Sequence, residues 1–535
     1  MIFRHRFLVI WFVLWLTACN APVTTPTAAT IPAASTPTSV TAEPSALSTS
    51  TVLPSGPVIV IDSTQARPFP RQLLGTNVPA WLNPMRLGDE TFISRTADLG
   101  LSLLRMPGGS WSNAYAWADC ETGGEGCYWP WAAKPSDFLR FARAVNAEMI
   151  WTVSINGSAQ EAAALVAFFN GSVDDERPLG VDARGRDWLT VGHWARLRAE
   201  TGNPTPFPVR YWEIGNEVYG AKRDVGSNCA EWGWEDVWTC DPDEYLHGAT
   251  VNGITYDGYL AFYDAMKAVD PSIQIGAVGV EKPDEWRNWG NRVIAGAGEK
   301  IDFYVVHYYP YFQPPENPAG ALQQPQRSWS TTMADLQAAF NRYSGRQIPV
   351  AVTEYNLVAF QDADNGQLMR RAVNMLFIAD TIGQMATNGV TIANQWDLAN
   401  GRAYNGTDYG LLDADTFEPN PAYYALQLWS RFGDELLTTQ TPFDPAQTLS
   451  VYAGRRTDGT LTLLAINKTA QPQTAIVVIP AGQWRVTTTV VQASDLLAES
   501  VTLDVRDNGM TIEESANYEY TFAPYTLTLL TFTKP

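Results

Sequence analysis

Short apolar runs alternate with longer amphipathic stretches from about Arg71 onward. This alternation is typical of units in which a β-strand is followed by an α-helix, and such units build parallel sheets. The runs expected to form strands are residues 73–75, 101–104, 149–153, 209–214, 273–278, 301–306, 350–353 and 390–394. Eight units predict an α/β fold, a closed (β/α)8 or TIM barrel, whose functional side chains lie at the C-terminal ends of the strands.

Helical periodicity separates most of these runs. The clearest examples are residues 136–147, 159–169, 256–269, 332–343 and 367–387. A doubly wound open sheet is the alternative architecture. It lacks support because the segment Gly123-Gly124-Glu125-Gly126 does not lie between a strand and a helix, where a phosphate-binding loop would lie.

The helical pattern stops near Asp434. Short alternating stretches follow, separated by turn residues such as Asp458-Gly459, at residues 448–453, 461–466, 474–478, 484–491 and 525–532. They predict a C-terminal antiparallel β-sandwich domain over residues 434–535. The catalytic barrel is then expected over residues 58–433, and the strand-like run at its start is expected to join the sandwich.

The first 19 residues have the pattern of an export signal. Basic residues 4–6 precede an apolar run, 7–16, that is too short to span a bilayer. The next residues, Leu16-Thr17-Ala18-Cys19, resemble a bacterial lipobox, which implies cleavage before Cys19 and lipid attachment to its thiol. An ordinary signal peptide with a chance cysteine is the alternative. We expect an exported lipoprotein anchored to the outside of the bacterial cell membrane.

Composition narrows the classes of partner. Residues 20–57 are rich in Thr, Pro, Ser and Ala and nearly free of charge, which predicts a disordered linker. The 535-residue chain has a net charge of −20, which argues against a nucleic-acid partner because phosphate contacts need clustered Lys and Arg. Its 20 tryptophans fit a protein that stacks sugars on aromatic rings, although large barrels also bury Trp in their cores.

Four further cysteines fall into two close pairs. We predict the disulfides Cys120–Cys127 and Cys229–Cys240, which an oxidising compartment permits, while two other connectivities remain open. A zinc site is the competing interpretation. It is disfavoured because neither pair has two-residue spacing or a set of His partners nearby.

Two carboxylates follow predicted strands on opposite sides of the barrel. Glu217 ends the segment 211–217 after the fourth strand, and Glu354 ends the seventh. Glycoside cleavage with retention of configuration needs two carboxyl groups about 5 Å apart. A single Glu at a strand end is more often solvated or salt-bridged, but the pair together predicts a retaining glycoside hydrolase.

Several motifs around these carboxylates resemble clan A glycoside hydrolases, and most closely the family 51 α-L-arabinofuranosidase-like enzymes. They are Leu104-Arg105-Met106-Pro107-Gly108-Gly109, residues 211–220, Val306-His307-Tyr308-Tyr309 and Thr353-Glu354-Tyr355. The similarity extends from about Arg71 to the C-terminus. It implies a barrel followed by a β-sandwich, the architecture that the apolar pattern also predicts.

The resemblance assigns a role to each matching residue. Glu217 is the expected acid/base, with a pKa raised by burial and by the nearby carboxylate, and Glu354 is the expected nucleophile. Arg105 would lower the pKa of Glu354 and orient it. Asn216 would bind the sugar 2-hydroxyl, and Tyr309 would donate a hydrogen bond to the nucleophile.

Other matching positions leave the sugar open. His307 is expected to support the site, and Asn156 and Trp396 are candidate sugar contacts, with barrel packing as the alternative for Trp396. Two positions depart from the family pattern. Ser110 replaces the usual Asn after the Gly-Gly turn, and residues 75–78 lack the acidic sugar contact expected of an arabinofuranosidase.

The leading hypothesis is a hydrolase of plant-type polysaccharide or oligosaccharide, with α-L-arabinofuranosidase first. An endo-β-glycanase of the same clan (a glucanase, xylanase or xyloglucanase) is second, because the long Trp-rich segment 219–253 could line an extended cleft. A non-catalytic glycan-binding lipoprotein is the alternative from another class. The expected partners are a carbohydrate and, through the lipid, a membrane; no cofactor or metal is required, and the oligomeric state is left open.

Overall fold

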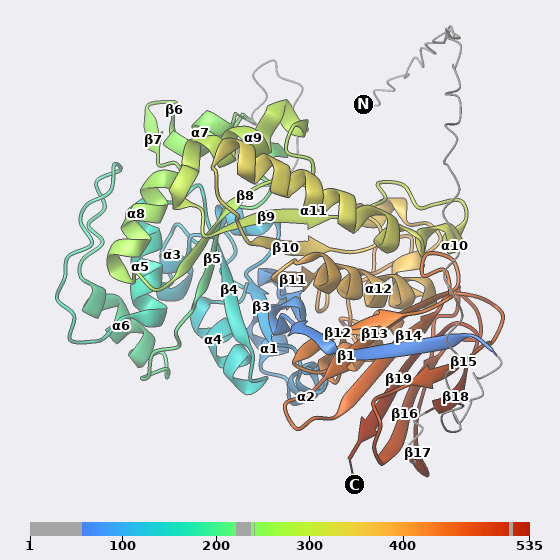
Figure 1. Ribbon diagram of the computed structural model, residues 1–535. Helices are drawn as coiled ribbons and strands as arrows, with labels where there is room; N and C mark the ends of the chain where they lie inside the picture. The colour runs from blue at the N-terminus through green and yellow to red at the C-terminus, as the bar shows by residue number, and fades with distance from the viewer. Residues whose placement is uncertain (1–55, 221–236, 240, 513–516, 535) are drawn as a thin grey trace, which may run out of the picture. The chain divides into compact units, whose positions relative to one another are not determined.

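The computed structural model describes residues 56–220, 237–239, 241–512 and 517–534 (Figure 1). The predicted signal, Cys19, most of the linker, Cys229 and Cys240 lie outside the described residues. Of the second predicted disulfide nothing can therefore be reported, whereas the Cys120–Cys127 disulfide is present, which confirms that prediction. Among the helices that the structure describes, none combines the length and the apolar character needed to cross a membrane.

Eight parallel strands close into a barrel in the order β10-β11-β2-β3-β4-β5-β8-β9. In chain order they are β2 (Gly75–Asn77), β3 (Leu103–Met106), β4 (Glu148–Val153), β5 (Tyr211–Ile214), β8 (Gln274–Val278), β9 (Phe303–Tyr308), β10 (Val350–Tyr355) and β11 (Ile392–Gln395). Each predicted strand overlaps one of these, so the predicted (β/α)8 barrel is confirmed. The predicted fourth and seventh strands are β5 and β10.

Helices cover the outside of the barrel strands (Figure 1). They are α1 (Asn83–Leu87), α2 (Glu90–Asp98), α3 (Trp117–Thr122), α4 (Pro135–Ala144), α5 (Ala159–Asn170), α6 (Val191–Glu200), α7 (Pro242–His247), α8 (Tyr259–Val269), α9 (Glu285–Ala297), α10 (Pro318–Ala321), α11 (Gln324–Tyr343), α12 (Ala372–Asn388) and α13 (Pro421–Ser430). A short hairpin of β6 (Ala249–Val251) and β7 (Ile254–Tyr256) precedes α8. The helices bury an apolar face against the strands, and residues such as Trp151 and Trp212 on the strands are almost fully buried.

The second architectural part is a nine-stranded sheet in the order β17-β16-β19-β14-β13-β12-β1-β15-β18. Its strands are β1 (Val58–Pro68), β12 (Glu435–Gln440), β13 (Leu449–Arg455), β14 (Leu461–Asn467), β15 (Gln473–Val478), β16 (Trp484–Gln492), β17 (Thr502–Ile512), β18 (Asn517–Phe522) and β19 (Thr526–Thr533). Pairing is antiparallel except between β1 and β15. This mostly antiparallel domain confirms the predicted C-terminal β-sandwich class. In Figure 1 the blue β1 lies beside the orange strands of the C-terminal region.

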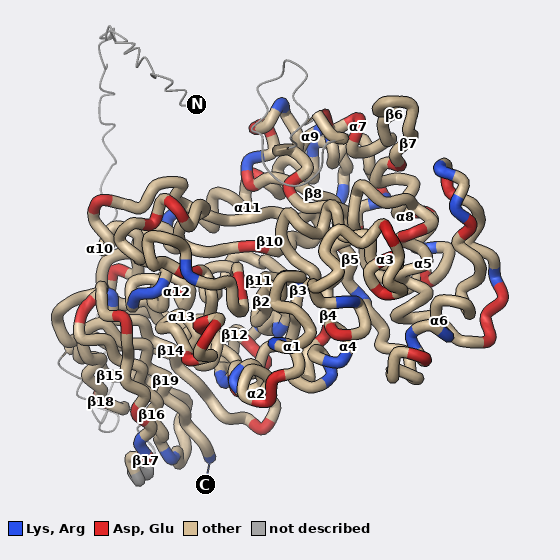
Figure 2. The backbone as a smooth tube through the Cα atoms, turned by 180° about the vertical axis from the view of Figure 1, so that it is seen from behind, with Lys and Arg blue, Asp and Glu red and all other residues tan. Residues whose placement is uncertain are grey.

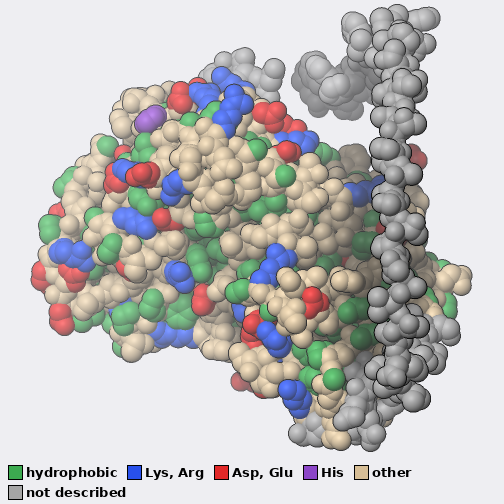
Figure 3. Space-filling model, in the orientation of Figure 1, with side chains coloured by type: hydrophobic (Ala, Val, Ile, Leu, Met, Phe, Trp, Pro, Cys, Tyr) green, Lys and Arg blue, Asp and Glu red, His purple; other side chains and the backbone are tan. Residues whose placement is uncertain are grey.

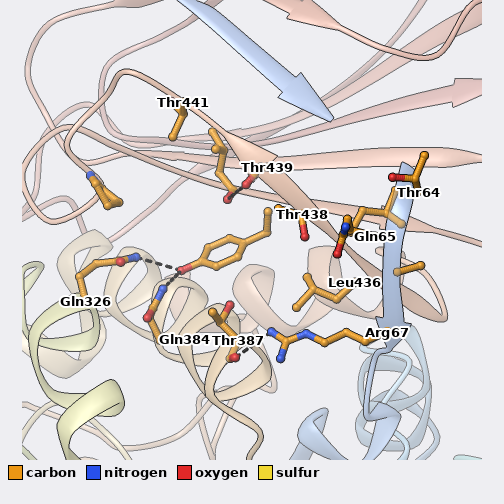
Figure 4. Close-up of a pocket in the computed structure, with 15 residues that line it drawn as sticks. Thr64, Gln65, Arg67, Gln326, Gln384, Thr387, Leu436, Thr438, Thr439 and Thr441 are labelled. Atoms are coloured by element: carbon orange, nitrogen blue, oxygen red, sulfur yellow. Dashed lines mark hydrogen bonds between the residues drawn. The ribbon is translucent and has the colours of Figure 1, made fainter. Parts of the chain in front are cut away.

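A buried ion pair joins the barrel helices to the sheet. Lys468, which follows β14, places its Nζ 2.6 Å from Asp380 Oδ2 of α12, and both side chains are buried. The hydroxyl of Tyr452 on β13 donates to Asp380 Oδ1 over 2.6 Å. Gln326 and Gln384 donate to the same hydroxyl beside a cavity of about 570 Å³ (Figure 4). These polar contacts fix the sheet against α11 and α12, away from the predicted catalytic carboxylates.

Charged residues are distributed over the whole described chain. Segments of Lys and Arg and segments of Asp and Glu are scattered along the backbone in Figure 2. On the face drawn in Figure 3, charged and hydrophobic side chains are likewise mixed.

Candidate active site

The two predicted catalytic carboxylates lie at the same end of the barrel. Glu354 is the fifth residue of β10, and Glu217 follows β5 by three residues. Both line one cavity of about 440 Å³. Gly215 and Glu217 have positive φ angles of 80° and 48°, so the chain turns sharply after β5. Such a conformation is unusual for a Glu and is common where a functional side chain must be aimed.

The separation of the carboxylates fits the retaining geometry. One carboxylate oxygen of Glu217 and one of Glu354 lie within 4.8 Å of each other, and a nitrogen of His307 lies within the same distance of both. Retaining glycosidases hold their two carboxyl groups about 5–5.5 Å apart, whereas inverting enzymes leave about 6.5–9.5 Å for a water. The site therefore has room for direct attack by one carboxylate and none for a water between the two.

Arg105 organises the floor of the site from β3. Its Nη1 donates to Glu354 Oε1 over 2.8 Å, and its Nε and Nη2 donate to the two carboxylate oxygens of Glu213 over 2.8 and 3.0 Å. Further bonds from the guanidinium reach Asn77 Oδ1 over 2.8 Å and Asn216 Oδ1 over 2.7 Å. Because Arg105 is fully buried, it holds the nucleophile and does not line the cavity itself.

Asn216 is fixed on both sides. Its backbone N–H donates to Asn113 Oδ1 over 2.8 Å, and its carbonyl accepts from Asn113 Nδ2 over 2.6 Å. Its own Oδ1 accepts from Arg105, which leaves its Nδ2 without a partner in the described part of the chain. Asn216 is 1% exposed and does not line the cavity, so its predicted contact with a sugar hydroxyl stays a prediction.

His307 and Tyr309 bring two further groups to the carboxylates from β9. The Nδ1 of His307 lies 2.8 Å from Glu217 Oε1 and 3.5 Å from Glu354 Oε2. The hydroxyl of Tyr309 donates to Glu354 Oε2 over 2.9 Å. With Arg105 on its other oxygen, Glu354 has both oxygens held, which orients it as a nucleophile requires.

The protonation of the pair differs from the sequence-based expectation. Burial alone would raise the pKa of Glu217, but the hydrogen bond and the charge of His307 outweigh burial and hold that pKa below its ordinary value. Burial raises the pKa of Glu354, against the opposing attraction of His307 and Arg105. The predicted rise for Glu217 is therefore wrong for the unliganded site, because the sequence did not show that His307 contacts it. Burial lowers the pKa of His307 less than the carboxylates of Glu354 and Glu217 raise it.

Comparison with known families bears on this geometry. Residues 95–317 match the family model described as the alpha-L-arabinofuranosidase 1 domain. This part of the chain is similar to an α-L-arabinofuranosidase domain. The resemblance to the family 51 arabinofuranosidase-like glycoside hydrolases is thereby confirmed.

Curated relatives are about a quarter identical to this chain over the aligned residues. Alpha-L-arabinofuranosidase C of Emericella nidulans is 26% identical over 236 residues, which are 40% of this chain and 38% of that protein. The intracellular exo-alpha-(1->5)-L-arabinofuranosidase 1 of Bacillus subtilis is 26% identical over 227 residues, 40% of this chain and 37% of that protein. The chain thus spans less than two fifths of the length of these relatives.

Solved structures show the same fold over nearly all of the described chain. A GH51 alpha-L-arabinofuranosidase from Thermotoga petrophila has a TM-score of 0.68 at 19% identity, covering 89% of this chain and 100% of that one. A family 44 xyloglucanase from Paenibacillus polymyxa has a TM-score of 0.58 at 14% identity, covering 90% and 100%. At these identities the likeness concerns the architecture, a barrel with an appended sheet domain.

The two candidate sugar contacts, Trp396 and Asn156, line different cavities. Trp396 lines the catalytic cavity beside Gly109, where a Cβ would lie 2.3 Å from the indole ring. Asn156 does not line that cavity. Its Oδ1 accepts from Trp238 Nε1 over 2.9 Å, and it faces a second cavity of about 310 Å³ together with Glu161.

Sequence reasoning missed three residues of the site. Glu213 is a fully buried acid in the middle of β5, and a charge within an apolar strand was the signal that could have found it. Tyr219 donates to Glu217 Oε1 over 3.3 Å, and Glu281, which follows β8, lines the cavity. Within the described residues, Glu217, His307 and Glu354 are also the one group of metal-type ligands close enough to share an ion.

Proposed function

We propose that the protein is a retaining glycoside hydrolase that removes α-L-arabinofuranosyl units from plant-type polysaccharide or oligosaccharide. The observation that carries this proposal is the spacing of less than 4.8 Å between oxygens of Glu217 and Glu354 at the mouth of the barrel. That spacing fits a double displacement in which one carboxylate attacks the sugar directly.

The first step uses both carboxylates at once. Glu354 Oε2 or Oε1 attacks the anomeric carbon as the bond from that carbon to the leaving oxygen breaks, and Glu217 gives its proton to the leaving oxygen. In the second step Glu217 takes a proton from a water, and the water oxygen displaces Glu354 from the anomeric carbon. Two inversions at one carbon give net retention, and the enzyme returns to its starting protonation.

Glu217 and His307 together hold the proton that the first step gives to the leaving oxygen. The two groups lie 2.8 Å apart, so one proton between them serves either atom. A leaving oxygen that approaches Glu217 develops negative charge in the transition state, which draws the proton to the carboxyl and away from the imidazole. Arg105 and Tyr309 meanwhile stabilise the ionised form of Glu354.

The arabinofuranosyl unit is proposed from the comparisons. The matching family model and the named relatives are all of the arabinofuranosidase type. An endo-β-glycanase is the alternative outcome of the test below. A purely glycan-binding role is disfavoured because both carboxylates are present and correctly spaced.

The test is release of nitrophenol from a panel of aryl glycosides, followed by methanolysis of the active one. We expect release from the α-L-arabinofuranoside and formation of methyl α-L-arabinofuranoside, the retained product. Release of the β-methyl product would contradict a double displacement. Silence on the whole panel with activity on a β-glucan, xylan or xyloglucan would replace the arabinofuranosidase proposal with the endo-β-glycanase.

We further propose that the protein is exported and held on the outside of the bacterial membrane by a lipid on Cys19. The lipobox-like sequence and the Pro-rich residues 20–57 support this, as does the Cys120–Cys127 disulfide, which suits an oxidising compartment. Mass spectrometry of the full chain expressed in bacteria tests it. A diacylglyceryl mass on Cys19 and recovery in the membrane fraction, both lost in Cys19→Ala, are expected; an unmodified Cys19 would contradict the anchor.

A further inference from the structure

A third carboxyl group lies in the catalytic cavity and takes no part in the proposed chemistry. Glu281 follows β8 and lines the same cavity as Glu217 and Glu354. β8 is the direct neighbour of β5, which leads to Glu217. Glu281 therefore stands on the acid/base side of the site, where the leaving group departs.

The carboxyl of Glu281 has no hydrogen bond or ion pair within the described part of the chain. The neighbouring Lys282 is instead paired with Glu285, Nζ to Oε1 over 2.9 Å. The side chain is partly exposed and lines the cavity, so its carboxyl group is open to a ligand there. A ligand in the cavity can supply the missing partner.

Burial also sets the protonation of Glu281. It raises the pKa of this carboxyl to about 8, while Lys282 and His307 act in the opposite direction and Glu285 adds to the rise. At neutral pH Glu281 is thus a protonated acid with one O–H to donate and an oxygen to accept. A neutral group of this kind matches the hydroxyls of a sugar, which both donate and accept.

Exposed aromatic rings border the same cavity. Phe312 and Phe360 are 63% and 50% exposed, and their ring centroids lie 5.9 Å apart. Both line the cavity with Glu281. Two exposed rings side by side at a cavity form a contiguous apolar surface, and aromatic faces suit the apolar faces of sugar rings.

We propose that Glu281, with Phe312 and Phe360, forms the site for the leaving part of the substrate, and that this part is an uncharged sugar chain. Glu281 positions a hydroxyl of the first leaving sugar, and the two rings support the units beyond it. This inference rests on the proposed function and names the feature by which the enzyme distinguishes an oligosaccharide from a simple aryl glycoside.

The experiment compares two substrates in three variants. The substrates are 4-nitrophenyl α-L-arabinofuranoside, whose leaving group offers no sugar hydroxyl, and α-1,5-linked arabinotriose. Glu281→Leu is expected to lower kcat/KM on arabinotriose about tenfold or more, the worth of one buried hydrogen bond, and to change the aryl substrate less than about threefold. Glu281→Gln, which keeps a donor and an acceptor, is expected to restore most of the loss. Glu161→Gln is the matched control, because Glu161 is another carboxyl whose pKa is raised by burial, but it faces the second cavity.

The pH profile adds a readout that a structural role would not move. In the wild type, the ratio of kcat/KM on arabinotriose to that on the aryl substrate is expected to fall as the pH rises through about 8, where Glu281 ionises. The proton shared by Glu217 and His307 matters more for the sugar leaving group than for nitrophenol, so its loss also lowers this ratio. In Glu281→Gln only that part of the fall is expected to remain, so the ratio should fall less than in the wild type, and the difference between the two profiles belongs to Glu281. Equal losses on both substrates in Glu281→Leu, or no loss on either, would overturn the proposal.

Binding separates this inference from the proposed function. Calorimetry with arabinotriose on Glu354→Ala, compared with Glu354→Ala carrying Glu281→Leu, measures the site without turnover. If the wild type cleaves no arabinofuranoside, the proposed function fails, yet an affinity lowered about tenfold by Glu281→Leu still supports the sugar site. If arabinofuranoside is cleaved but the two variants bind arabinotriose equally, the inference about Glu281 fails alone.

Discussion

The imidazole Nδ1 of His307 lies 2.8 Å from Glu217 Oε1, so the proposed acid and its neighbour share a proton. This contact lowers the pKa of Glu217 and, with the charge of Glu354, raises that of His307. Glu217 Oε1 and His307 Nδ1 can each hold a proton. One proton must stay on the pair, because the first step gives it to the leaving oxygen. The alkaline limit of activity is therefore set by the pair as a whole.

Replacing His307 is expected to narrow the active pH range. In the wild type the last proton leaves the pair as the pH rises through the raised pKa of the imidazole, above its ordinary value of about 6.5. In His307→Gln only the carboxyl of Glu217 remains to hold it. We expect the alkaline limb of kcat/KM on arabinotriose, whose leaving sugar needs protonation, to move to lower pH. An alkaline limb that stays in place would show that His307 does not hold the proton.

Leaving-group dependence distinguishes the two carboxylates. Glu217→Ala is expected to lose about 10²–10⁴-fold in kcat/KM on a poor leaving group such as a sugar, which needs protonation, and much less on nitrophenol. Added azide should restore turnover in Glu217→Ala and give the azide of retained configuration, because azide needs no base. Glu354→Ala should lose activity on both substrates. Azide rescue of Glu354→Ala with retention would reverse the assignment.

Arg105 should be essential for both stability and activity. Arg105→Met leaves the buried Glu213 without its partner, and we expect a loss of about 3–5 kcal/mol in the free energy of unfolding. Arg105→Lys keeps the charge but cannot reach both carboxylates in a fork, so it should fold better and still lose kcat. Denaturant unfolding and aryl glycoside kinetics measure the two effects. Arg140→Lys is the control and should change neither, because the Arg140 side chain is half exposed and keeps its charge next to Asp137.

Glu161 is expected to make stability depend on pH. Burial raises its pKa to about 7 in the folded protein from an unfolded value near 4.5. Between these values the folded state binds more protons than the unfolded state, so stability falls as the pH rises from about 4.5 to 7 and is constant above. Glu161→Gln should be more stable than the wild type at pH 8, by up to about 3 kcal/mol, and equal to it at pH 4. The exposed Glu176→Gln should show no such difference.

The ion pair between Lys468 and Asp380 should couple the sheet domain to the barrel. Lys468→Met leaves Asp380 buried and uncompensated, and a loss of about 3–5 kcal/mol is expected. The double variant Lys468→Met with Asp380→Leu should recover part of it. Thermal unfolding measures both, with the exposed Lys282→Met as control. If the double variant were less stable than Lys468→Met, the uncompensated charge of Asp380 would not be the cause of the loss.

The strands of the barrel were predictable because each is a short buried run between polar segments. Three strands of the sheet were missed, and β17 shows why. Its burial pattern is mostly exposed, and its segment 502–508 lies at the edge of the sheet, so it has no apolar face to mark it. β18 is likewise an edge strand, while β12 has only two buried residues.

The site was predictable where a residue type is tied to a strand end. Glu217, Glu354 and Tyr309 could be proposed in that way, and the structure brings them into one cavity. The contact of His307 with Glu217 could not, because it depends on how the turn after β5 faces β9. The position of the Asn156 side chain could not be predicted either. It accepts a hydrogen bond from Trp238, which lies more than 80 residues later in the sequence.

β1 opens the described fold, yet its partners lie at the other end of the chain. Val60 pairs with Gln440, and Val58 pairs with Ile476. During synthesis or export, β1 therefore emerges before the other described strands. Its edges stay unpaired until β12 and β15 have also emerged. A fragment cut at residue 433 would keep that strand without its neighbours and would be prone to aggregate. An isolated barrel should accordingly begin after Pro68. Folding of the full protein is completed only when β1 pairs with β12 and β15.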